Sequence, residues 1–202
     1  MKRTDVILSV GTLALVLVAA AVVAATGTTH EFAEWAWARH HNVLSWYIRP
    51  LFILPFCYFA YKRSLWGIVL TVVALATSMF WFPAPEHSSP AVNEMLASER
   101  QYLTANWTLW KVLIALLVPL GFAALALAFW RRSLAWGLAV INAMVLFKIG
   151  WTFLFSTEAG AMSHLPAALL GLVLCDALIL FFMRRMRARS SFRHPQPKGH
   201  HG

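Results

Sequence analysis

Charged residues are scarce in this sequence. Only 12% of the 202 residues are Asp, Glu, Lys or Arg, and 60% are hydrophobic. A soluble domain carries about 25% charged residues. A soluble fold of this length could not bury so much apolar surface, so lipid must be the solvent for most of the chain. The scarcity of charge argues against a soluble globular protein and predicts an integral membrane protein.

Cysteines and acidic residues are also few. The two cysteines, Cys57 and Cys175, both lie inside apolar segments, which predicts free core thiols and no disulfide framework. Eight acidic residues stand against 17 basic ones, for a net charge of +9. In a soluble protein this balance would suggest nucleic-acid binding. Here the basic residues flank hydrophobic runs, so we expect contact with a membrane surface and no nucleic-acid partner.

The motifs of common enzymes are missing as well. The chain has no nucleophile elbow, phosphate-binding loop, cysteine pair, dinucleotide fingerprint or His-Glu-x-x-His zinc motif. This absence favours a protein without catalytic activity but leaves the question of an enzyme open. No cofactor is predicted.

Six apolar segments are the main feature of the chain. Each is about as long as the roughly 20 residues that a helix needs to cross the hydrocarbon of a bilayer, and lipid offers no partner to an unpaired backbone. We therefore predict an all-α, polytopic membrane helix bundle with one six-helix domain over residues 1–193 and a disordered tail at 194–202. The predicted spans are about 6–26, 43–61, 65–82, 107–130, 134–155 and 166–183.

Basic residues predict the orientation. Twelve of the 17 fall on the side that holds both termini and two short turns, Lys62–Ser64 and Arg131–Ser133. The positive-inside rule places this side in the cytoplasm of a bacterial inner (plasma) membrane. An alternative for the first segment is a cleaved signal peptide, although its apolar run is long for one. Arginines after the last span should contact anionic lipid: Arg184, Arg185, Arg187 and Arg189.

The two longer loops, on the predicted outer side, contain helix signals. Thr28-Thr29-His30-Glu31 matches a capping box, and Ser89-Pro90 is typical of an N-cap followed by Pro at the first helical position. An apolar stripe with helical spacing follows the second signal. We expect a short helix in each loop, lying on the membrane surface.

Two predicted hairpins resemble each other. Lys62-Arg63-Ser64 resembles Arg131-Arg132-Ser133, and Pro50 matches Pro119 when the basic pairs are aligned. Helices two and three would then repeat as helices four and five, in parallel, around an axis along the membrane normal, as in some transporters. The alternative is convergence, because basic turns and interfacial tryptophans are demanded of any membrane hairpin.

Polar residues inside the spans are the candidates for a binding site. Asp176 lies near the predicted bilayer centre, where a charge costs at least about 2.5–3.5 kcal/mol, so it should face the bundle interior and find a partner. Lys148 is the best candidate partner, at an offset of roughly 5 Å along the helices. Three interpretations stay open: a structural pair, a pair that binds a substrate or ion, and two separately satisfied residues.

Three further polar residues belong to this candidate site. Asn142 is expected to make an interhelical hydrogen bond. Arg49 and Lys111 lie near outer helix ends, where snorkelling to the headgroups is the simpler interpretation. The alternative is an outward-facing cationic cavity of Arg49, Lys111 and Lys148, which would suit an anionic substrate or a lipid phosphate. In that case Glu94 and Glu99 would fold over its mouth.

Histidines and glutamates gather in the outer loops and offer ligands for a metal ion. The weak candidates are His30, Glu34, His41 and His87. Their spacing matches no metal motif, so solvated faces of surface helices are the simpler interpretation.

These features favour a small binding or transport protein whose intramembrane polar site opens to the outer face. One alternative is an accessory subunit of an envelope complex, with a lateral membrane partner or as a homo-oligomer. The other is a membrane-embedded enzyme with an outer-face metal site. The sequence does not identify the ligand.

Overall fold

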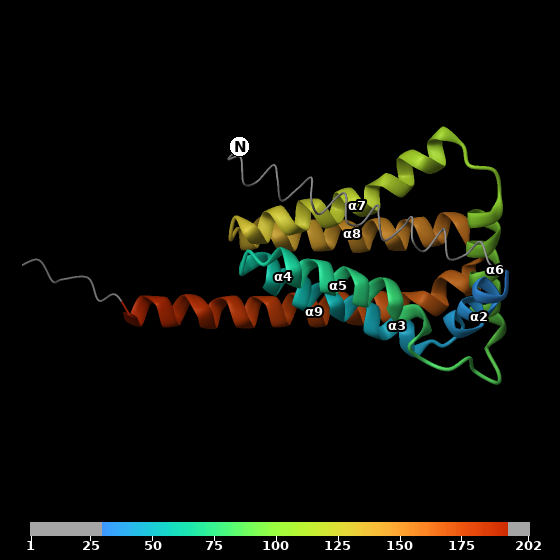
Figure 1. Ribbon diagram of the computed structural model, residues 1–202, viewed down its shortest axis with the longest axis horizontal. Helices are drawn as coiled ribbons and strands as arrows, with labels where there is room; N and C mark the ends of the chain where they lie inside the picture. Colours follow the sequence, from blue (N-terminus) through green and yellow to red (C-terminus); the bar gives the residue numbers. More distant parts are fainter. Residues whose placement is uncertain (1–29, 194–202) are drawn as a thin grey trace, which may run out of the picture.

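The computed structural model describes residues 30–193, and these form helices and turns without a strand (Figure 1). The all-α prediction is confirmed for this part of the chain. The predicted first span at 6–26, with its signal-peptide alternative, and the tail at 194–202 lie outside the described residues.

The helices follow one another with short connections. In chain order they are α2 (His30–His40), α3 (Leu44–Ile48), the 3-10 helix η1 (Arg49–Phe52), α4 (Ile53–Tyr61), α5 (Leu65–Thr77), the 3-10 helix η2 (Ser78–Phe80), α6 (Pro90–Thr104), α7 (Leu109–Trp130), α8 (Leu134–Phe155) and α9 (Glu158–Arg193).

Three helices of the described part are long and apolar enough to cross a membrane: α7, α8 and the Glu158–Arg185 stretch of α9. A fourth span results only if α2 and the Leu44–Tyr61 segment are joined, and these two meet at 78°. The apolar helix Leu65–Phe80 is shorter. Leu146, Leu154 and Val173 are 64–78% exposed on the long helices, as lipid-facing side chains would be. The chain is therefore a membrane protein with at least three candidate spans.

Prolines mark the irregular points of these helices. Pro50 is in the first turn of η1, the 3-10 segment between α3 and α4. Pro119 lies inside α7, and the first half of α7 bends away from α8 (Figure 1). A proline inside a helix removes a backbone hydrogen bond and clashes with the preceding turn. It therefore accounts for this bend.

The α4–α5 and α7–α8 hairpins have the same turn. Arg63 and Arg132 both have a φ of 57°, and each following serine N–H donates to a carbonyl five residues back, at 2.9 Å. The hairpins also contact each other reciprocally. Arg63 Nε donates to the Trp130 carbonyl, 3.4 Å away, and the Arg132 guanidinium lies 5.0 Å from the centre of the Tyr61 ring. Exchanging the two hairpins maps the residue pair Arg63–Trp130 onto Arg132–Tyr61, where the first contact is a hydrogen bond to the backbone and the second is a cation–π contact.

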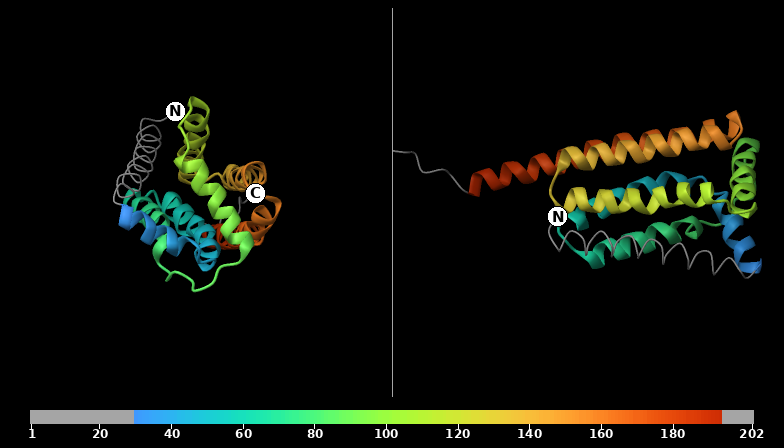
Figure 2. Two further views of the ribbon diagram at one scale, coloured as in Figure 1. Left: turned by 90° about the vertical axis from the view of Figure 1, so that its right-hand side faces the viewer. Right: turned by 90° about the horizontal axis from the view of Figure 1, so that it is seen from above.

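The two turns lie at one end of the bundle, and α6 lies across the other end (Figures 1 and 2). We call the latter the α6 end. Ser89 Oγ accepts from Val92 N–H, and Pro90 begins the helix, so the predicted cap is confirmed. The buried stripe of α6 packs against α3 and α9 in a small cluster, with Trp46, Val92, Met95, Leu96 and Ala167.

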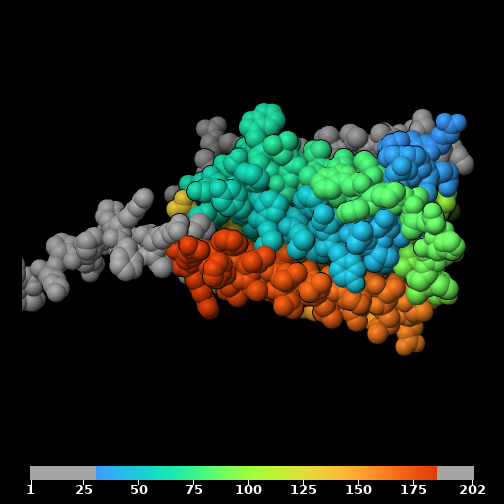
Figure 3. Space-filling model, turned by 90° about the horizontal axis from the view of Figure 1, so that it is seen from below, coloured from blue at the N-terminus to red at the C-terminus, as the bar shows by residue number. Residues whose placement is uncertain are grey.

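The main apolar core lies deeper, between α4, α5, α7, α8 and α9. Its largest buried members include Phe56, Ile68, Leu125, Phe129 and Ile141. α3, η1 and α4 run along α9 (Figure 3). There a Cβ at Gly171 would lie only 2.3 Å from Pro50 Cβ, so this close approach of η1 to α9 requires glycine.

Candidate functional site

Five ionisable side chains converge at the α6 end, and they come from five different helices. This polar cluster consists of His40, Arg49, Glu99, Lys148 and His164. All five line a cavity of about 410 Å³. Cavities of about 300–1,000 Å³ are typical of small-molecule sites.

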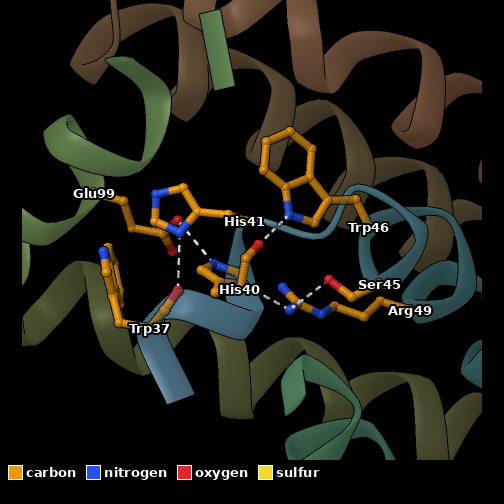
Figure 4. Close-up of polar contacts among 7 residues, drawn as sticks. All are labelled: Trp37, His40, His41, Ser45, Trp46, Arg49 and Glu99. Atoms are coloured by element: carbon orange, nitrogen blue, oxygen red, sulfur yellow. Dashed lines mark hydrogen bonds and ion pairs between the residues drawn. The ribbon is translucent and has the colours of Figure 1, made fainter. Parts of the chain in front are cut away.

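His40 is the centre of the cluster, with only 5% of its surface exposed (Figure 4). Arg49 Nη2 lies 2.8 Å from His40 Nδ1 and 3.3 Å from Ser45 Oγ. Because a guanidinium can only donate, Nδ1 must accept, and the ring proton sits on Nε2. Nε2 lies 3.5 Å from Glu99 Oε2. The geometry thus orients a chain of donors from Arg49 through His40 to Glu99.

Helix α3 holds this arrangement in place. Trp46 is 2% exposed, and its Nε1–H donates to the His40 carbonyl at 3.2 Å (Figure 4). Its ring also packs against His164, with the two ring centres 5.2 Å apart. The break between α2 and α3 therefore brings His40 and Arg49 together, because the chain bends by 78° between them.

Glu99 reaches into the cavity from α6. Burial raises the pKa of its carboxyl. The hydrogen bond from His40 and the electrostatic influence of Lys148 and Arg49 outweigh burial and lower this pKa to about 2. Glu99 is therefore a carboxylate at neutral pH, balanced by the cations around it.

Several polar atoms of the cluster have no protein partner. Arg49 Nε and His164 Nδ1 are buried and lack a hydrogen bond. The Lys148 side chain is exposed, and its ammonium makes no hydrogen bond or ion pair with any residue that the structure describes. Unsatisfied buried polar groups are costly and need an explanation. A ligand with acceptor oxygens would satisfy Arg49 Nε and pair with the Lys148 ammonium.

A second cavity, of about 390 Å³, adjoins the first between α6, α7 and α8. The two share the residues Met95, Glu99, Val118, Met144 and Lys148. Lys148 therefore lies at the junction of the two cavities. The bend of α7 at Pro119 lies beside this space.

The predicted contact between Lys148 and Asp176 is not formed. Asn142 Nδ2 instead donates to Asp176 Oδ2 at 2.9 Å and to the Leu138 carbonyl at 2.9 Å, which is an interhelical hydrogen bond as predicted for Asn142. The offset estimate failed because α9 begins at Glu158 and not at Pro166. The contact with Asn142, six residues from Lys148 along α8, places Asp176 roughly 9 Å deeper than Lys148. Neither Asp176 nor Asn142 lines the cavity.

Of the two outer cations, Arg49 faces the cavity and Lys111 does not. Arg49 turns inward to His40 instead of snorkelling. The Lys111 ammonium donates to the backbone carbonyls of Tyr102 and Ala105 at the end of α6 and lies over the Tyr102 ring. It lines neither cavity.

The candidate metal ligands do not come together. Glu34 pairs with Arg100, the Nδ1 atom of His41 lies 3.0 Å from the Trp37 carbonyl, and His87 is exposed in the loop before α6. The side chain of His30 lies outside the described residues. Within the described part, no three His, Cys, Asp or Glu side chains are grouped closely enough to hold a metal ion.

Sequence reasoning anticipated part of the cluster. It offered Glu99 only as an alternative, and the structure places it opposite Arg49, while Glu94 accepts from Thr157 Oγ1 at 2.8 Å. His40 and His164 were counted only among the histidines of the outer loops and not in the intramembrane site, because they lie outside the apolar runs.

No family model, curated protein or solved structure matches this chain.

Proposed function

We propose that this chain is a binding or transport protein that holds a small molecule inside the membrane, in the cavity around the polar cluster. The observation that carries this proposal is the set of unpartnered polar atoms on Arg49, Lys148 and His164, which face one cavity from three different helices. Charges inside a membrane bundle are costly and are typical of ligand or ion pathways. A purely structural cluster would pair them.

The proposal includes an orientation. The α6 end faces the outside of a bacterial inner membrane, and both termini lie in the cytoplasm, in a bundle of six spans. Support comes from the basic turns at the opposite end, Lys62–Ser64 and Arg131–Ser133, and from Arg184 and Arg185, which would contact anionic lipid. The site would then open to the outer face.

We also propose that the α4–α5 and α7–α8 hairpins are a parallel repeat. The matching turns and the reciprocal contacts of Arg63 and Arg132 support it. Repeats around an axis along the membrane normal occur in some transporters.

A cavity-filling substitution tests the binding function. Ala168 lines the cavity, and the neighbouring Leu169 is 45% exposed on the outside of α9. Protein extracted from its membrane in polymer discs without detergent is analysed by native mass spectrometry. We expect a bound small molecule in the unmodified protein and in Leu169→Phe, and its loss in Ala168→Phe. Equal occupancy in both variants, or none in the unmodified protein, contradicts the proposal.

Cysteine labelling tests the orientation. The two native cysteines are buried, so a membrane-impermeant maleimide should report an introduced cysteine. Ser88→Cys, in the loop before α6, should react in intact cells. Ser64→Cys, in the turn between α4 and α5, should react only after the cells are opened. The reverse pattern contradicts the proposed orientation.

A further inference from the structure

We infer that the ligand is an anionic amphiphile: a carboxylate or phosphate headgroup between Arg49 and Lys148, with a hydrocarbon chain against the apolar walls of the cavity. This inference rests on the proposed binding function and adds the chemical class of the ligand and its route of entry.

The charge of the site favours an anion. Arg49 and Lys148 are two basic residues, and Glu99 contributes one negative charge that His40 already contacts. One positive charge is therefore left in excess. The free donors, Arg49 Nε and the Lys148 ammonium, are of the kind that bind carboxylate and phosphate oxygens. A cationic ligand would leave these donors unsatisfied and add to the repulsion.

The rest of the cavity favours a hydrocarbon chain. Beyond the polar cluster, its lining is apolar and comes from η1 and α4, α5, α7, α8 and α9: Pro50, Ile53, Leu75, Phe122, Ile141 and Leu172. A free inorganic anion would contact only the polar end and leave this surface empty. Burying a chain here removes apolar surface from water, at about 0.8 kcal/mol per CH₂ group in general.

The second cavity supplies a lateral route. It extends from Lys148 to the outside of the bundle between α7 and α8, below α6. Val118 lines both cavities and is 50% exposed, and Phe147 is 40% exposed. The bend at Pro119 keeps α7 away from α8 at this level (Figure 1). A single-chain amphiphile can therefore move from the bilayer with its headgroup towards Lys148 while its chain stays among apolar side chains.

The test is a thermal-shift titration of the full chain in a neutral sugar detergent, with dodecyl phosphate as the probe. The comparison probes are dodecanol, dodecyltrimethylammonium and inorganic phosphate. We expect a saturable rise of Tm with dodecyl phosphate and a much smaller response to the other three. Lys148→Met and Arg49→Gln should each weaken the binding of dodecyl phosphate by about tenfold or more.

Matched variants distinguish the effect of the positive charge at residue 148 from the effect of losing any positive charge. Lys111→Met removes the same group from a neighbouring helix outside both cavities and should leave the response to dodecyl phosphate intact. Lys148→Arg should retain most of it. If Lys148→Met fails to fold, the comparison of dodecyl phosphate with dodecanol on the unmodified protein decides the same point.

Each result has one meaning. An equal shift with dodecanol overturns the anionic headgroup, and an equal shift with inorganic phosphate overturns the chain. An undiminished shift in Lys148→Met and Arg49→Gln places binding elsewhere and overturns the inference. If native mass spectrometry finds a ligand that Ala168→Phe loses but that ligand is neutral or cationic, the inference fails while the proposed binding function stands.

Discussion

Replacing Gly171 with alanine should force α9 away from η1. The added Cβ would lie 2.3 Å from Pro50 Cβ and 2.7 Å from Pro50 Cγ, whereas ordinary contacts are 3.4–4 Å. The proline ring is rigid and cannot rotate away, so the two helices must separate by about 1 Å. The separation also weakens the contact in which Cys175 Sγ donates to the Pro50 carbonyl, at 3.2 Å. Overpacking of this kind costs about 1–3 kcal/mol.

Gly150→Ala is the matched control, because a Cβ at Gly150 has no atom within 4 Å. Both substitutions gain the same intrinsic helix preference of alanine over glycine, about 1 kcal/mol. The difference between the two variants therefore isolates the clash. We expect Gly171→Ala to be less stable than Gly150→Ala by about 1–3 kcal/mol, measured as reversible unfolding in mixed micelles by circular dichroism. Equal stability of the two variants would refute the close approach of η1 and α9.

Three more outcomes follow from particular contacts. The pKa of Glu99 is lowered from 4.5 to about 2. The stability that the Glu99 carboxylate contributes is therefore present above pH 4.5 and is lost as the pH falls towards 2. Unfolding measured as a function of pH should show this loss in the unmodified protein and not in Glu99→Gln. Arg63→Gly should stabilise the chain by about 1 kcal/mol, because Arg63 has a positive φ and, among the described residues, a single long side-chain hydrogen bond. A lower Tm in this variant would show that the side-chain contact contributes more than the backbone strain. Asn142→Leu should lower the free energy of unfolding by about 1–3 kcal/mol, because Asp176 loses its hydrogen-bond donor. Adding Asp176→Leu should recover part of that loss. If the losses of the two single variants add up in the double variant, the pairing is contradicted.

Local signals in the sequence predicted much of the fold. The apolar runs predicted α7 and α8, and Ser89-Pro90 predicted where α6 begins, because caps and hydrophobic length act over a few residues. The predicted span at 166–183 lies within α9, but the helix itself begins earlier, at Glu158, and continues through Pro166. Neighbouring helices in a membrane bundle can satisfy the groups that a proline frees.

The candidate site was harder to predict because it depends on how far each helix is shifted along its axis relative to its neighbours. Moving the start of α9 by eight residues separates Asp176 from Lys148 and brings His164 into the cavity instead. His40 and Glu99 meet only because α6 folds back across the bundle. The spacing of residues within one segment of the sequence cannot predict a contact between two separate helices. The sequence identified Arg49 and Lys148 because a cation near an apolar run is conspicuous in any register.

Lys148 and Lys111 should respond differently to the same substitution. The Lys148 side chain is exposed and makes no hydrogen bond or ion pair with the described residues, and its electrostatic influence on Glu99 is one of several, so Lys148→Met should change Tm little. Lys111→Met removes two hydrogen bonds to backbone carbonyls and should lower Tm. Thermal unfolding without added ligand measures both. A residue that contributes little to the stability of the empty protein but strengthens ligand binding is one whose role is in binding. If Lys148→Met is as destabilising as Lys111→Met, Lys148 supports the fold, and the case for a ligand at this position is lost.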